Sequence, residues 1–275
     1  MKKNQNYDVV IVGGGHNGLS AACYLAEAGK KVVVIEGREK IGGMASSGYL
    51  IPEAPQHLIH PCALDLMSLR VHPMMPQELQ LERHGFRQVE MAPGYVYLHP
   101  DGHSLVFWRD PAKTAAEIRR FSEHDATEFL ALMRLIDAFM DMAIPMMRVD
   151  PSQRNLGAKW EALKAVLRNR HLKPEIMALI GSPAYVSIME RFEHPVTQSA
   201  MCALLGAAGP ITNEATGIYF ALLGFIHRFG LGRAALQIGD IKAPLIHPFV
   251  AAFEDLIHHL LKPLRIEQAP LQMPD

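Results

Sequence analysis

The strongest constraint on this fold is a glycine pattern near the N-terminus. Four β-branched residues, Val9–Val12, precede three glycines in the spacing G-x-G-x-x-G, and a second apolar run ends in Glu36. Two continuous apolar runs joined by a helical pattern are typical of neighbouring strands in a parallel sheet that is buried on both faces. We therefore predict strands at residues 9–12 and 31–36, and between them a helix at 17–28 that stops at Gly29.

The three glycines and the acidic residue have the positions of a dinucleotide-binding site. Gly13 permits a tight turn, Gly15 lets a pyrophosphate approach the backbone, and Gly18 lets the helix pack closely on the sheet. Unpaired N–H groups at the helix N-terminus attract phosphate. The carboxylate of Glu36 would accept the ribose hydroxyls and repel a 2′-phosphate, which argues against NADP. The alternative is a glycine-rich turn that binds no ligand.

A second glycine pair follows the acidic residue in "GREKIGGMASSG". The first fingerprint alone fits both FAD and NAD, but the extended pattern resembles the FAD motif of glutathione-reductase-like and amine-oxidase-like flavoproteins. In those proteins the Gly-Gly loop lies beside the FAD pyrophosphate, so the resemblance implies FAD, with Arg38 near the ribose or adenine. The predicted cofactor-binding residues are Gly13, Gly14, Gly15, His16, Asn17, Gly18, Glu36, Gly37, Arg38, Gly42, Gly43, Met44 and Ala45.

The motif "GGGHNGL" points to a smaller group within these flavoproteins. With the sequence around it, it is similar to the phytoene desaturase-like FAD-dependent oxidoreductases, including their pyridine nucleotide-disulfide oxidoreductase domain relatives. The likeness covers residues 6–145 and thins afterward. It implies an FAD-dependent oxidoreductase that acts on a hydrophobic small molecule, by desaturation or oxidation with hydride transfer to flavin.

The resemblance also implies the fold class and its division along the chain. We expect an α/β fold, in which a Rossmann-type FAD-binding domain carries an inserted α+β, largely helical substrate domain. Residues 1–75 would form the N-terminal part of the FAD-binding domain, 76–235 the substrate or cap domain, and 236–275 the start of the return to the FAD domain and a tail.

Within the middle region, several local patterns predict individual elements. The turn signal at Pro100–Gly102 separates two β-branched and aromatic runs, which predicts a hairpin. A short helix is expected at 111–120, further helices at 156–205, and another at 215–229 that is ended by Gly230.

A methionine-rich helix is expected after Ser122, which forms an S-x-x-D cap with Asp125. Its apolar residues recur at helical spacing, and Pro145 is expected to end it. We favour a helix packed on a core. One alternative is that the helix forms an adaptable apolar wall of a substrate tunnel, since methionine fits irregular ligands. Another is that the helix lies at a membrane surface, but its lack of a basic face argues against this.

No catalytic base or metal site can be named from the sequence. His227 and Arg228 are weak candidates for catalysis, and a pair that simply ends a helix explains them better. The close histidine pairs have no established ligand spacing, and no cysteine pair joins them. These pairs are His57 with His60, His99 with His103, and His258 with His259.

Composition restricts the partners and the compartment. A formal net charge of −1 gives no electrostatic case for nucleic acid. Three separated cysteines suggest no disulfide framework, which favours a cytoplasmic protein. The apolar run after the two N-terminal lysines is too short for a signal peptide, and no stretch is long and apolar enough to span a bilayer. A peripheral membrane contact is a further alternative.

The C-terminal part lacks half of the resembled fold. Residues 250–261 would form the returning helix and "EQAPLQMPD" a loose tail, while the sheet would keep an open edge. Either the chain is truncated or a second polypeptide completes the fold, and we favour the partner. The resulting interpretation is a subunit of an FAD-dependent oxidoreductase. The alternatives are a non-catalytic FAD- or nucleotide-binding subunit that stabilises an active partner, and an NAD-binding dehydrogenase.

Overall fold

The computed structural model describes residues 6–38, 41–57, 59, 67–71, 74–149, 154–211, 214, 216–234, 255–256 and 266–268. The chain divides into two compact units. Unit 1 comprises Met1–Val89 and Gly232–Asp275, and unit 2 comprises Glu90–Leu231. The sequence-based domain division at 75/76 and 235/236 stays a prediction.

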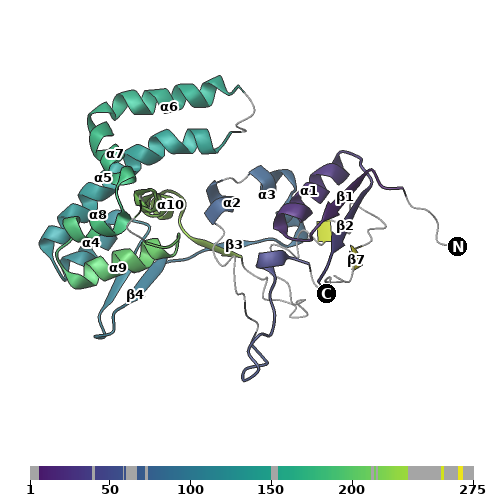
Figure 1. The fold of residues 1–275 in the computed structure, drawn as a ribbon, viewed down its shortest axis with the longest axis horizontal. Coiled ribbons are helices and arrows are strands. Elements are labelled where there is room, and N and C mark those ends of the chain that lie inside the picture. The colour runs from purple at the N-terminus through teal and green to yellow at the C-terminus, as the bar shows by residue number, and fades with distance from the viewer. Residues whose placement is uncertain are drawn as a thin grey trace. The chain divides into compact units, whose positions relative to one another are not determined.

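A parallel sheet of three described strands forms the centre of unit 1 (Figure 1). The strand β1 (Val9–Val12) pairs with β2 (Val32–Glu36), and β2 pairs in turn with β7 (Ile266–Gln268). In this register Val9 lies opposite Val32, and Val34 opposite Ile266. The predicted strand–helix–strand unit is confirmed, with its helix α1 at His16–Glu27.

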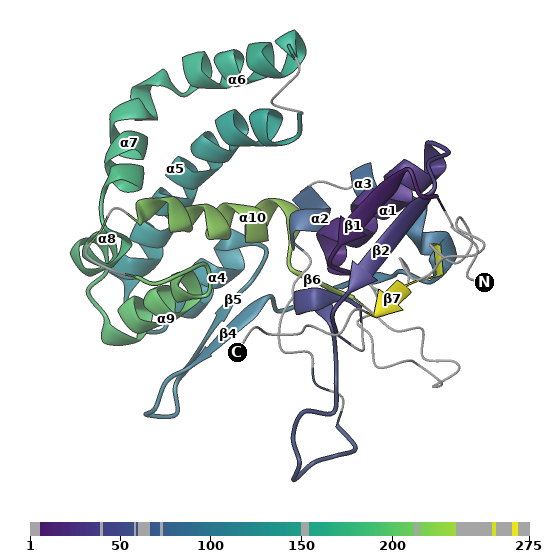
Figure 2. The same ribbon diagram turned by 45° about the vertical axis from the view of Figure 1, so that its right-hand side comes forward.

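The core of unit 1 forms where α1 covers one face of this sheet (Figure 2). Leu19, Ala22 and Cys23 of α1 are buried against Val32 and Val34 of β2. Short elements follow β2 in the sequence, and Ala45, Leu79 and Leu81 from this region are buried in the same core. These elements are η1 (Gly43–Ala45), α2 (Met67–Val71), α3 (Met74–Glu78) and η2 (Leu81–His84).

Two findings concern the C-terminal predictions. The expected tail was wrong at Glu267 and Gln268, because these residues belong to β7 and pair with β2. Of the predicted helix at 250–261, only residues 255 and 256 are described. They are helical, and Leu256 is buried in the core of unit 1. The rest of that prediction lies outside the described residues.

The chain crosses between the units in two short strands. The strand β3 (Gln88–Glu90) and the strand β6 (Gly232–Ala234) pair in a two-stranded sheet.

Unit 2 is mostly helical, with one hairpin. The predicted hairpin is confirmed as β4 (Tyr95–Leu98) and β5 (Ser104–Phe107), which pair antiparallel. The helical elements are α4 (Pro111–Arg119), α5 (Glu123–Met147), α6 (Leu156–Arg168), η3 (Arg170–Leu172), α7 (Lys173–Gly181), α8 (Ala184–Arg191), α9 (Pro195–Gly206), η4 (Gly217–Phe220) and α10 (Ala221–Phe229).

The long helix α5 organises this unit. It begins as predicted, because the hydroxyl of Ser122 accepts a hydrogen bond from the Asp125 N–H at 3.1 Å. The prediction that Pro145 ends the helix was wrong, since α5 continues to Met147. Proline lacks an N–H and so removes one bond near the last turn, but the Arg148 N–H still closes that turn on the Ile144 carbonyl at 3.2 Å.

The methionines of α5 are in part core residues. Met133 and Met140 are buried with Phe129, Leu132 and Ile136, as the packed-helix interpretation expects. The two described cavities that this helix helps to line are each only about 10 Å³, which leaves no room for a ligand. Among the described residues, no helix is long and apolar enough to cross a membrane.

Candidate nucleotide-binding site

The turn between β1 and α1 exposes the start of a helix. The Gly13 N–H donates to the Ile35 carbonyl at 2.7 Å, which holds the turn against the end of β2. The helix begins after Gly15, with no side chain capping it and no acidic residue in its first turn. Because the first N–H groups of a helix have no partner within it, this end of α1 is suited to an anion.

Gly18 cannot be replaced here without a backbone shift. A Cβ atom built on it would collide with the carbonyl oxygen of Gly13 and would also touch Ile11 at 3.3 Å. The helix therefore packs directly on the strand end, as predicted for the third glycine of the motif.

The second glycine loop lies against the first. The Gly42 N–H donates to the Gly14 carbonyl at 2.7 Å, and Gly15 and Gly42 form an isolated parallel bridge. A Cβ on Gly43 would lie only 3.2 Å from the Cα of Gly15. Gly42 has φ +119°, which side-chain-bearing residues rarely adopt. Two loops that are distant in sequence thus form one narrow backbone surface.

Glu36 closes this surface at the end of β2. Its carboxylate accepts hydrogen bonds from the Gly14 N–H at 2.7 Å and from the Arg38 N–H at 3.0 Å. Partial burial acts to raise the pKa of Glu36, but the backbone N–H donors of Arg38, Gly14 and Gly37 and the charge of Arg38 outweigh it. The net result is a pKa of Glu36 below its ordinary value, so the carboxylate is charged at neutral pH.

The structure brings together part of the predicted site. Gly13, Gly14, Gly15, Glu36, Gly42 and Gly43 converge through the contacts above. His16, Asn17, Gly37 and Arg38 lie exposed along its rim, and Met44 is exposed while Ala45 is buried in the core of unit 1.

Sequence reasoning missed Ile41, which is buried behind the first loop. A Cβ on Gly14 would lie 2.9 Å from the Ile41 side chain, so this residue supports the loop from behind. An isolated apolar residue directly before a glycine pair was the available signal.

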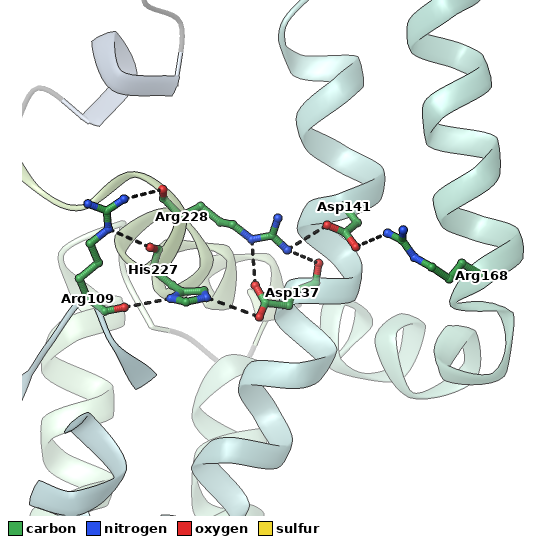
Figure 3. Close-up of polar contacts among 6 residues, drawn as sticks. All are labelled: Arg109, Asp137, Asp141, Arg168, His227 and Arg228. Carbon is green, nitrogen blue, oxygen red and sulfur yellow. Dashed lines mark hydrogen bonds and ion pairs between the residues drawn. The ribbon is translucent and has the colours of Figure 1, made fainter. Parts of the chain in front are cut away.

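The weak catalytic candidates in unit 2 belong to a charged network (Figure 3). Arg228 donates to the carboxylates of Asp137 at 3.0 Å and Asp141 at 2.9 Å, and Arg168 binds Asp141 from the other side. His227 bonds the Arg109 carbonyl through Nδ1 at 2.9 Å. The carboxylate partners raise the pKa of Arg228, even though burial acts to lower it. The network links α10, α5 and α6.

Two further features have groups or space that a ligand would need. Among the described residues, His124, Asp125 and Glu193 could approach a metal together. However, the oxygens of Asp125 already accept the backbone N–H groups of Glu193 and His194 at 2.8 and 3.1 Å. In unit 1, a cavity of about 570 Å³ is lined by residues between 69 and 88, and none of the predicted nucleotide residues lines it.

Comparison with known proteins shows similarity to flavoenzymes. Residues 8–80 match the family of FAD dependent oxidoreductases. The chain is similar to one subunit of the limonene dehydrogenase of Castellaniella defragrans, with 34% identity over 129 residues, which are 47% of this chain and 23% of that protein. It is also similar to pyridine nucleotide-disulfide oxidoreductase domain-containing protein 2 of Mus musculus, with 28% identity over 73% of this chain and 38% of that protein.

Among solved structures, a triple mutant of putrescine oxidase superposes with a TM-score of 0.52 at 17% sequence identity. The match covers 94% of this chain and 50% of that protein. The chain thus matches half or less of the length of each of these proteins. The predicted fold class of unit 1 and unit 2, the resemblance to FAD-dependent oxidoreductases and the cofactor FAD are confirmed.

Proposed function

We propose that this chain is a subunit of an FAD-dependent oxidoreductase that acts on a hydrophobic small molecule and needs a second polypeptide. The observation that carries the proposal is the placement of the Glu36 carboxylate, 2.7 Å from the Gly14 N–H, at the edge of two adjoining glycine loops. A negative charge at that edge is complementary to the hydroxyls of a ribose, and the positive end of α1 is complementary to a pyrophosphate.

We propose that the two adjoining glycine loops and Glu36 hold FAD. The N–H groups in the first turn of α1, which have no partner within the helix, would hold the pyrophosphate. Gly15 and Gly43 let the two loops approach each other closely because neither has a Cβ. Glu36 would accept the ribose hydroxyls, and Arg38 would lie near the ribose or adenine. When bound, FAD supplies a flavin ring that accepts hydride from a substrate carbon.

The substrate class is proposed from resemblance. One relative is named a limonene dehydrogenase, and limonene is a hydrocarbon. The same relative is named as a subunit, which supports an assembly of more than one polypeptide.

The free edge of the sheet in unit 1 supports a partner. Among the described strands β1 has a neighbour on one side only. Val10 and Val12 alternate with the core-packed Val9 and Ile11, and they are 55% and 84% exposed on the other face of the strand. Parallel sheets are normally covered on both faces, and an open apolar edge invites association. We propose that a second polypeptide covers this edge and supplies the other half of the flavoenzyme fold, in the cytoplasm.

A non-catalytic FAD-binding subunit is the alternative, because a fold does not fix a function. Purification of the chain with its partner separates the two proposals. An absorption spectrum of bound flavin that bleaches on addition of a hydrophobic substrate supports catalysis, whereas bound flavin that no substrate bleaches supports the alternative. A soluble, FAD-loaded and active monomer on size-exclusion chromatography contradicts the need for a partner.

A further inference from the structure

The helix α6 has an apolar stripe that its own unit leaves uncovered. Leu156, Trp160, Leu163 and Leu167 recur at spacings of four, three and four residues and are 75%, 56%, 46% and 58% exposed. At about 100° per residue, these positions share one side of the helix. Exposed apolar patches of this kind mark sites of interaction with a protein or a membrane.

The opposite side of α6 carries the contacts with the rest of unit 2. Ala165 is buried, and Ala158, Ala162 and Asn169 on the same side are half-buried. This side faces α5, and Figures 1 and 2 both show α6 running along the outer margin of that helix. The stripe therefore points away from the body of unit 2, and its exposure follows from how the helix is packed.

The charges around the stripe are predominantly basic. Lys159 lies about 70° to one side of its centre and Lys164 about 70° to the other, by helical geometry. The segment 154–173 has one acidic residue, Glu161, against six basic residues, so its formal charge is +5 in a chain whose net charge is −1. The six are Arg154, Lys159, Lys164, Arg168, Arg170 and Lys173. Lys164 pairs with Glu161 at 2.7 Å, and Arg168 pairs with Asp141 of α5.

We infer that α6 docks on the surface of an anionic lipid bilayer, with its apolar stripe inserted at the headgroup boundary. A helix with tryptophan and leucine on one side and lysines beside them is the pattern of interfacial membrane helices. Tryptophan favours that depth because its ring is apolar and its N–H is polar. Protein interfaces are depleted in lysine, so two lysines flanking the stripe favour lipid over a protein partner. The helix lies in the membrane plane and does not cross it.

Vesicle binding of the full 275-residue chain tests this inference. The chain should sediment with phosphatidylcholine vesicles that contain phosphatidylserine, bind pure phosphatidylcholine more weakly, and lose affinity as salt is added. The double variant Trp160→Ala/Leu163→Ala should bind anionic vesicles at least about tenfold more weakly, because it removes apolar area that the bilayer would bury. Lys159→Gln/Lys164→Gln should lose on the order of 20-fold, about fivefold per charge.

A matched control is available on the hairpin. Leu98 of β4 is 75% exposed, like Leu156, but lies outside α6. Leu98→Ala should bind vesicles like the unchanged chain, while Leu156→Ala should bind more weakly. In a Trp108→Phe variant the remaining tryptophan is Trp160, and its emission should shift to the blue when anionic vesicles are added.

Three outcomes would overturn the inference. The first is that the chain does not bind anionic vesicles, and the second is that the α6 variants bind them as tightly as the unchanged chain. The third is that the chain does not bind vesicles but associates with itself, and that the α6 variants abolish this self-association. The last would assign the stripe to a second copy of the chain. Because the substituted side chains of α6 and β4 are largely exposed, circular dichroism should show that these variants fold.

Discussion

The carboxylate of Glu36 bonds the backbone N–H of Gly14 at 2.7 Å, joining the end of β2 to the glycine turn after β1. The two residues are 22 positions apart, and the helix α1 lies between them in sequence. One side chain therefore holds the turn in place, and under the proposed function the same side chain would also bind the ribose of FAD. Binding and local stability are thus expected to depend on the same group.

Replacement of this carboxylate should weaken FAD binding. Glu36→Gln removes the charge that would hold the ribose hydroxyls, and hydrogen bonds to a charged group are worth about 1.5–3 kcal/mol. The dissociation constant for FAD should therefore rise roughly 10- to 100-fold. Quenching of flavin fluorescence during titration measures it. Glu53→Gln, at an exposed position of the same unit, is the control and should bind FAD normally.

The free energy of unfolding of unit 1 should decrease at acid pH because Glu36 becomes protonated. Because its folded pKa is lowered, its contribution is fully present above the unfolded pKa near 4.5 and is lost as the pH falls through the folded value. Urea unfolding of the chain and of Glu36→Gln should therefore differ at pH 7 and converge at strongly acidic pH. A difference that is constant with pH would contradict this prediction.

Gly18→Ala should destabilise unit 1 and impair FAD binding. The added methyl group would collide with the Gly13 carbonyl, and relief requires a backbone shift that costs about 1–3 kcal/mol. Urea unfolding measures the loss. The matched control is Gly181→Ala at the end of α7, where an added Cβ meets nothing within 4 Å, and this variant should be as stable as the unchanged chain.

Arg228→Met should loosen the charged network of unit 2. It leaves Asp137 and Asp141 without their shared partner, and hydrogen bonds to charged groups predict a loss of about 1.5–3 kcal/mol in the free energy of unfolding. Arg119→Met removes only an exposed pair with Glu123 and should cost under about 1 kcal/mol. Equal effects of the two substitutions would argue against a structural network.

Val12→Asp should separate assembly from folding. The side chain of Val12 is 84% exposed, so the free energy of unfolding of the isolated variant should lie within about 0.5 kcal/mol of that of the unchanged chain. Co-purification with the second polypeptide should be lost, because a charge on the exposed face of β1 opposes burial of that face by a partner. Val96→Asp, at an exposed position of β4, should leave co-purification intact.

Local patterns predicted the elements whose signals are contained in a few residues. The strand at 9–12, the helix after the glycines and the hairpin around residues 100–102 all follow from apolar runs and turn residues, and the structure has them. The cap at Ser122 was equally visible, because an N-cap bond spans three residues. Glu36 was identified from its distance to the glycines.

Long-range contacts could not be predicted in the same way. The three residues of β7 have no strand pattern of their own and are ordered by pairing with β2. The contact of Ile41 with Gly14 depends on how two loops meet. The stripe on α6 was present in the sequence, but its importance depends on exposure, which only the packing of α6 on α5 reveals.

The pairing of β2 with β7 also has a consequence for synthesis. Val34 lies opposite Ile266, and all of unit 2 is encoded between them. A growing chain leaving the ribosome must therefore finish unit 2 before this ladder can form. Until then β2 has an unpaired flank, and newly made chains at this stage should be the ones that depend most on chaperones.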